Sequence, residues 1–151
     1  MEDTVLHEIG FWHEPGSGRL AADPRRLVRP HWAADERTRL MAYLRAGAQV
    51  GAYMGTSYCR FGCGGAAPRL GCRDLSDGVW LWPDGLVHYL EVHDVALPEE
   101  FLAHARANDF RIPAVDVTTL AVTEEDRLAR SAVKWEAWVS DNGGVLPKGA
   151  T

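Results

Sequence analysis

The sequence contains no apolar run of the roughly 20 residues that a membrane-spanning helix needs. It also does not open with the basic and then apolar segment of a secretory signal. Basic residues are outnumbered, at 16 against 21 acidic ones, for a net charge of −5. That balance argues against a general nucleic-acid binder or a protein of anionic membranes. We therefore expect a cytoplasmic protein that binds neither nucleic acid nor membranes.

Several motifs of known enzyme classes are missing as well. We find no phosphate-binding glycine loop, no dinucleotide-binding fingerprint and no Gly-x-Ser-x-Gly elbow. The glycine-rich run GTSYCRFGCGG matches none of these patterns. The dipeptides His7-Glu8 and His13-Glu14 lack the second histidine of the zinc-protease helix motif. No activity can therefore be assigned from a motif.

What the chain does have is the composition of a folded domain. Of its 151 residues, 46% are hydrophobic and 25% charged, which is close to the average of globular domains and is enough to build a core. We expect one α+β domain over residues 1–140, with its core in 48–105, followed by a loose tail over 141–151.

Short alternating or apolar runs predict the strands, at 5–12, 48–58, 69–75 and 78–82. The last two are joined through Asp77-Gly78, a strong hairpin signal. Helical periodicity and capping residues predict helices at 33–47, from Leu86 onward, at 97–107 and at 124–139. Asp84 is the expected cap of the second helix, and Thr123 with Asp126 that of the last. The fold class is α+β, a small antiparallel sheet with a cysteine knuckle and about four helices.

The three cysteines lie in one stretch, between Cys59 and Cys72. In a reducing compartment, clustered cysteines indicate a metal site or reactive thiols rather than disulfides. Cys59 and Cys63 have the spacing of a zinc knuckle, and His88 and His93 the spacing of a zinc-binding histidine pair. Our leading hypothesis is a zinc ion held by these four residues.

Two features weaken this hypothesis. The 24 residues between Cys63 and His88 are many for a compact zinc finger. On a regular helix, positions five apart point about 140° apart, so His88 and His93 converge only if the helix ends or tightens between them. Other candidate ligands stay open, namely Cys72, His7, His13 and His104. Without metal, the same residues would be three reduced cysteines, a surface His88 and a core His93.

A second group of residues surrounds the predicted hairpin. Trp80 and Trp82 point to the same face of their strand, a pattern more typical of a core than of a binding platform. The alternative is a concave face, lined by Arg60, Asp77, Trp80 and Trp82, that binds a small molecule or a protein partner. Asp77 has the position of a turn residue, and Asp74 is a possible partner for Arg60.

Two other classes of function remain open. An enzyme acting on a small metabolite would use either a three-ligand zinc with an activated water or a thiol nucleophile. In the thiol case Cys59 is the nucleophile, His88 or His93 its base, and Arg60 lowers the pKa of the thiol. Asp77 is a further catalytic candidate. The third class is a metal-free interaction protein that uses the tryptophans.

Several stretches resemble a family of small uncharacterised bacterial proteins. They are LHEIGFW, DPRRLVRPHW, LRAGAQVGAYMGTSYCRFGCG and LGCRDLSDGVWLWPDGLVHYLEVHDVALPEEFLAH, which together cover roughly residues 5–105. The family pattern has a Ser-Trp/Tyr-Cys-Arg knuckle, an LTDG turn, a WVWPEGLAHY strand-to-helix segment and an LPEEF helix start. The resemblance implies no activity.

The resemblance does bear on individual residues. Those that match the family pattern are Cys59, Arg60, Asp77, Trp82, Pro83, Gly85, His88, Tyr89 and His93. Cys63 falls where relatives place a second cysteine, whereas Cys72 falls where they often have serine. The resemblance therefore favours Cys59, Cys63 and the two helix histidines over any site that needs Cys72, and it makes Arg60 and Asp77 candidate site residues. With the zinc hypothesis, we expect the protein to be an accessory or binding module.

Overall fold

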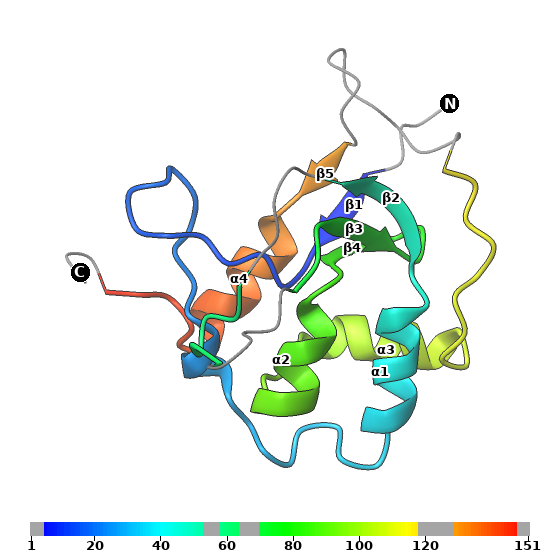
Figure 1. The fold of residues 1–151 in the computed structure, drawn as a ribbon, viewed down its shortest axis with the longest axis horizontal. Coiled ribbons are helices and arrows are strands. Elements are labelled where there is room, and N and C mark those ends of the chain that lie inside the picture. The colour runs from blue at the N-terminus through cyan, green and yellow to red at the C-terminus, as the bar shows by residue number, and fades with distance from the viewer. Residues whose placement is uncertain (1–4, 53–57, 64–69, 118–128, 148–151) are drawn as a thin grey trace.

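The computed structural model describes residues 5–52, 58–63, 70–117 and 129–147. These residues form an α+β fold with one mixed sheet and four α-helices (Figure 1). The strands are β1 (Leu6–Glu8), β2 (Ala48–Ala52), β3 (Arg73–Ser76), β4 (Trp80–Pro83) and β5 (Arg130–Ser131). The helices are α1 (Arg37–Arg45), α2 (Leu86–His93), α3 (Glu99–Ala107) and α4 (Val133–Asp141), with a 3-10 turn, η1, at Pro24–Leu27. The fold class and the number of helices are as predicted.

The strand order is β2-β3-β4-β1-β5. The pairs β2–β3 and β3–β4 are antiparallel, and the predicted hairpin between β3 and β4 is present. Gly78 adopts a φ of +94° in its turn, a conformation that glycine takes without steric cost. β1 instead lies parallel to both β4 and β5, so the sheet is mixed rather than purely antiparallel.

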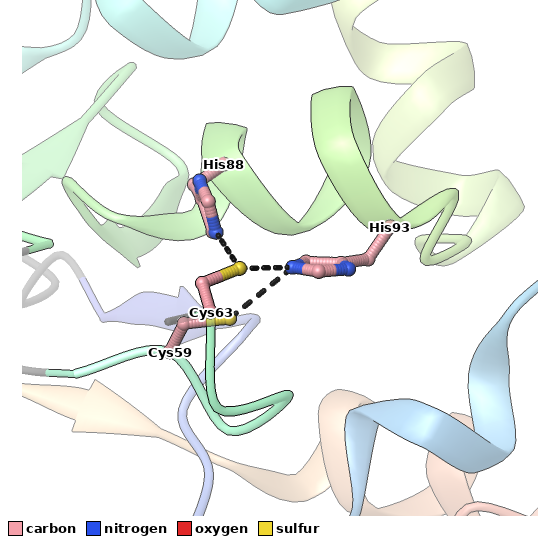
Figure 2. A group of neighbouring side chains, drawn as sticks. All are labelled: Cys59, Cys63, His88 and His93. Atoms are coloured by element: carbon pink, nitrogen blue, oxygen red, sulfur yellow. Dashed lines mark hydrogen bonds between the residues drawn. The ribbon is translucent and has the colours of Figure 1, made fainter. Parts of the chain in front are cut away.

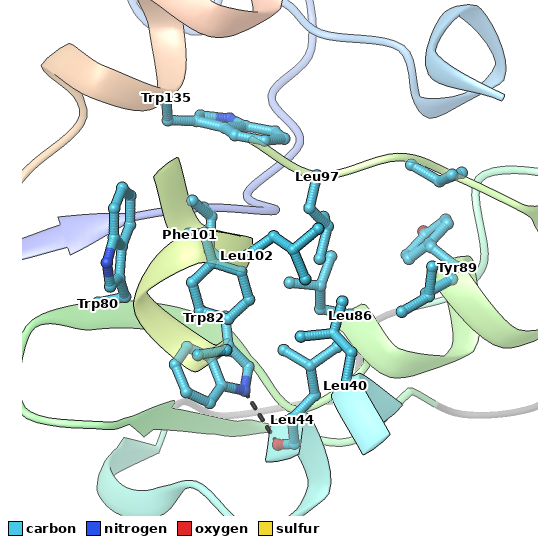
Figure 3. Close-up of a cluster of buried hydrophobic side chains, with 14 of the residues drawn as sticks. Leu40, Leu44, Trp80, Trp82, Leu86, Tyr89, Leu97, Phe101, Leu102 and Trp135 are labelled. Atoms are coloured by element: carbon cyan, nitrogen blue, oxygen red, sulfur yellow. Dashed lines mark hydrogen bonds between the residues drawn. The ribbon is translucent and has the colours of Figure 1, made fainter. Parts of the chain in front are cut away.

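The main core lies between one face of this sheet and the helices (Figures 1 and 3). Trp80 and Trp82 project from β4 into it, and the Trp82 indole N–H donates to the carbonyl of Leu44 on α1 at 3.1 Å. Aliphatic side chains from α1, α2 and α3 surround the indoles. The other face of the sheet carries a smaller cluster around Leu6 and Leu81. β4 is therefore buried on both faces.

The last helix differs from the prediction. It begins at Val133 rather than at 124, it continues to Asp141, and Arg130–Ser131 form β5. The proposed caps Thr123 and Asp126 lie outside the described residues, as do 53–57 of the strand predicted at 48–58. α2 begins after Gly85 without a side-chain cap, because the Asp84 carboxylate instead pairs with Arg73 at 2.9 Å.

The segment after α4, expected to be loose, makes backbone contacts where it is described. The Gly144 N–H donates to Val139, Asp23 donates to Gly144, and Leu146 donates to Ala21. These bonds fasten residues 144–146 beside the N-terminal part of the chain. None of the described helices is long and apolar enough to cross a membrane.

Candidate metal centre

The sulfurs of Cys59 and Cys63 lie on a tight turn of the cysteine knuckle, residues 58–63. The Gly62 N–H donates to the Cys59 carbonyl at 3.0 Å, and Gly62 takes a φ of +65°, where glycine is favoured. The Phe61 N–H points back at the Cys59 Sγ, at 3.4 Å. The turn thus directs a backbone donor at one sulfur and brings Cys63 round to the same side.

The two histidines converge at the end of α2 although they lie five positions apart. His93 is the last residue of the helix, and Asp94 after it is left-handed with a φ of 55°. The Asp94 N–H bonds to the Tyr89 carbonyl, five residues back instead of the usual four. The Val95 N–H bonds to the same carbonyl at 3.1 Å, so the helix closes directly after His93. The two rings meet beside this end, with centroids 5.1 Å apart, so the angular objection raised by the sequence does not hold.

The four side chains meet in one cluster, which Figure 2 shows between the knuckle and α2. Their donor atoms all lie within 4.8 Å of one another. The Cys63 Sγ is 2.9 Å from His93 Nε2 and 3.4 Å from His88 Nε2. The Cys59 Sγ is 3.3 Å from His93 Nε2. All four residues are partly buried.

These separations are those of a group that could hold a metal ion. Typical zinc–sulfur and zinc–nitrogen lengths place the donors of a tetrahedral site about 3.3–3.8 Å apart. Two of the three measured contacts fall at 3.3 and 3.4 Å. The third, at 2.9 Å between Cys63 and His93, would open by roughly half an ångström around an ion.

The electrostatics of the cluster agree with this chemistry. Burial lowers the pKa of both His88 and His93, so both rings are neutral near pH 7 and keep a lone pair for a metal. Burial, together with the neighbouring Cys59, raises the pKa of the Cys63 thiol. A cation among the four donors would reverse that effect, because it stabilises thiolates.

Aromatic side chains pack against the cluster. The Phe61 ring stacks on the His93 ring, with centroids 4.0 Å apart and planes within 3°. Tyr89, one turn earlier on α2, lies 6.1 Å from Phe61 between ring centroids. The Tyr89 hydroxyl accepts the Arg60 backbone N–H at 3.0 Å. The knuckle is thus fastened to α2 by ring packing and a hydrogen bond as well as by the cluster.

The other candidate ligands lie elsewhere. Among the described residues, the cluster of Cys59, Cys63, His88 and His93 is the one group with metal-site geometry. Cys72 does not belong to it, and neither do His7, His13 and His104. His104 instead lies 3.4 Å from the Asp77 carboxylate.

The predicted concave face of Arg60, Asp77, Trp80 and Trp82 is not formed. Trp80 and Trp82 are core residues, exposed by 2% and 0%. The Asp77 side chain is also buried, and one of its oxygens accepts the N–H groups of Val79 and Trp80 at 2.9 and 2.7 Å. Asp77 therefore shapes the hairpin turn and is unavailable to a substrate. Arg60 alone of the four faces a cleft.

That cleft was not foreseen from the sequence. It has a volume of about 640 Å³ and borders the cysteine–histidine cluster through Cys59 and the neighbouring Tyr89. Trp12, Asp74 and Arg130 also line it. The expected Arg60–Asp74 pair is not formed, because Arg60 pairs with Glu14 and Asp74 lies 3.6 Å from Arg130. Trp12 in FWHE and Tyr89 in LVHYL are aromatic residues of the sequence that could have indicated the cleft, but only the fold brings them together.

Comparisons of the chain with models of known protein families, with curated proteins and with solved structures find no significant match. The family resemblance noted in the sequence therefore stays a prediction. What can be said of function rests on the geometry of the chain itself.

Proposed function

We propose that the protein is a small zinc-binding module in which Cys59, Cys63, His88 and His93 hold one structural zinc ion. The observation that carries this proposal is the convergence of all four donors within 4.8 Å. Two thiolates with two imidazoles form a donor set that suits tetrahedral zinc. Four protein ligands close the coordination sphere, whereas a catalytic zinc keeps a position open for water.

The ion would act by fixing the knuckle against α2. Cys59 and Cys63 belong to the short described segment 58–63, which contains no regular helix or strand. His88 and His93 lie on α2, whose Leu86 and Leu90 are anchored in the main core. A zinc ion would thus join a loop to a rigid element, as expected of an accessory or binding module that presents that loop to a small molecule or protein partner.

The test is the zinc content of purified, untagged protein beside two single variants. We expect one zinc per chain in the wild type, none in Cys59→Ser, and one in Cys72→Ser, which removes a thiol outside the cluster. Removing the ion with a chelator should also lower the melting temperature. Wild-type protein without metal, or zinc retained in Cys59→Ser, would overturn the proposal.

One contact favours a second candidate, a thiol enzyme. The Cys59 Sγ lies 3.3 Å from His93 Nε2, within reach of a nucleophile–base pair. In a metal-free protein of this kind, Cys59 should react with iodoacetamide near neutral pH much faster than Cys72. Slow, similar labelling of the cysteines in metal-free protein would remove this candidate.

A further inference from the structure

The cleft next to the metal cluster is built at one edge of the sheet. β1 and β4 are parallel, so their carboxyl ends meet there, and the residues that follow them, Gly10–Trp12 and Gly85, line the cleft. The knuckle supplies Tyr58, Cys59 and Arg60 as another wall. The volume of about 640 Å³ lies within the range of small-molecule sites.

The apolar wall of the cleft is aromatic. Trp12 and Tyr89 meet edge to face, with ring centroids 5.5 Å apart. Phe11 lies beside them with the Arg130 guanidinium 4.5 Å from its ring centroid. Such walls favour a ligand with a planar, apolar body.

The two arginines of the cleft differ in how they are engaged. Arg130 is held between the carboxylates of Glu8, which is buried, and Asp74. The acidic partner of Arg60 is Glu14, whose side chain is 68% exposed. Exposed ion pairs contribute little, so an incoming carboxylate can take the place of Glu14.

Arg60 is nevertheless well positioned to receive such a group. Its backbone N–H is bonded to the Tyr89 hydroxyl, and one guanidinium nitrogen donates to the Trp12 carbonyl at 3.1 Å. These contacts fix the start and the end of the side chain beside the aromatic wall. A guanidinium group binds a carboxylate through two parallel hydrogen bonds.

Two buried polar atoms of the cleft residues lack a hydrogen-bond partner among the residues that the structure describes. The Trp12 Nε1 donor and the Asp74 Oδ1 acceptor are buried and have no hydrogen bond within the described part of the chain. Burial also raises the pKa of Asp74, although Arg130 acts in the opposite direction. A carboxyl group with a raised pKa carries its negative charge less readily, so Asp74 repels an anionic ligand less. A ligand hydroxyl can both donate and accept, so it matches the two unpaired groups.

We propose that this cleft binds a small organic carboxylate with a planar apolar body, and that Arg60 pairs with its carboxylate. The site goes beyond the zinc module and depends on it in one respect, because Arg60 follows Cys59 directly. Metal that fixes Cys59 also fixes Arg60, so the metal-loaded protein should bind more tightly than the metal-free one.

The experiment is isothermal titration calorimetry of the full chain, with the zinc content of each sample measured in parallel. The probe is 4-hydroxyphenylacetate, and its neutral amide and phenylacetate are the comparison compounds. We expect saturable binding of the probe, weaker binding of phenylacetate and no binding of the amide. Arg60→Gln should lower the affinity for the probe by about tenfold or more, because it removes a charge-assisted hydrogen-bonded pair. Arg106→Gln, the same charge change at a surface pair with Glu36, should have no effect.

The outcomes separate the two proposals. Zinc-containing wild type that binds none of the three compounds overturns the cleft proposal and leaves the metal centre intact. Saturable binding by protein without zinc supports the cleft and contradicts the metal centre. Equal binding of acid and amide, or full affinity in a folded Arg60→Gln, also overturns the cleft. If Arg60→Gln does not fold, Arg60→Lys keeps the charge and removes the two-pronged geometry, and an affinity equal to wild type then counts against the proposal.

Discussion

Removing the Tyr43 hydroxyl group tests whether Asp77 stabilises the fold. The Asp77 side chain is fully buried, and the Tyr43 hydroxyl donates to its Oδ2 at 2.6 Å. Its Oδ1 is already engaged by the backbone N–H groups of Val79 and Trp80. Tyr43 therefore joins α1 to the β3–β4 hairpin through a charged hydrogen bond, and Tyr43→Phe removes that bond together with the one that the hydroxyl accepts from Asn108.

The size of the effect follows from what phenylalanine keeps. The ring of residue 43 would still pack on Trp82, whose centroid is 6.1 Å away. What is lost is a hydrogen bond to a buried carboxylate, about 1.5–3 kcal/mol of the free energy of unfolding. The Asn108 side-chain amide also loses its 3.1 Å acceptor, which adds to the cost. With a urea m-value of about 1–3 kcal/mol/M, the unfolding midpoint should fall by about 1 M.

Urea unfolding of the purified protein, followed by circular dichroism, measures this directly. Tyr58→Phe is the matched control, because it deletes the same hydroxyl from a residue that is 61% exposed. Its midpoint should stay at the wild-type value. A Tyr43→Phe midpoint equal to that of the control would refute the idea that Asp77 is a buried anchor of the hairpin and would reopen its role as a site residue.

Two further predictions concern the whole fold. Burial lowers the pKa of four histidines, which are His7, His13, His88 and His93. As the pH falls through the ordinary histidine pKa of 6.5, the unfolded chain therefore takes up protons before the folded one does, which favours unfolding. The urea midpoint should be lower at pH 5.5 than at pH 7.5. An equal or higher midpoint at pH 5.5 would contradict this prediction. Gly10→Ala should destabilise more than Gly16→Ala: both positions have positive φ, but only at Gly10 would the new Cβ lie 2.5 Å from Leu86. Equal thermal melting of the two variants would count against that packing.

The parts of the fold that follow from local chemistry could be predicted. Asp77-Gly78 between two apolar runs predicted the hairpin, and Leu97-Pro98 with two acids predicted α3. This helix ends at Ala107 as expected, but it starts at Glu99, two residues later than predicted, with Pro98 as the residue before its first turn. The cysteine and histidine spacings likewise pointed to the four residues that the fold brings together. In each case the signal lies within a few residues of the element it defines.

The parts that depend on distant segments could not be predicted. β1 pairs with β4 and β5, which lie some 70 and 120 positions further along the chain, and nothing near Leu6 specifies a parallel partner. The shared face of Trp80 and Trp82 was read correctly, but alternation alone does not tell whether that face is covered. It is covered because β4 lies inside the sheet, with the helices over the indoles and Leu6 over Leu81. The cleft escaped prediction for the same reason, since its walls come from separate elements.

X-ray absorption at the zinc edge of the purified protein would show whether two cysteines and two histidines bind one zinc ion, because sulfur and nitrogen ligands differ in bond length. We expect two sulfurs at about 2.3 Å and two nitrogens at about 2.0 Å. A shell of three sulfurs would bring Cys72 into the site, and a shell of oxygen and nitrogen alone would place the metal elsewhere. Either result would rule out a zinc ion held by Cys59, Cys63, His88 and His93.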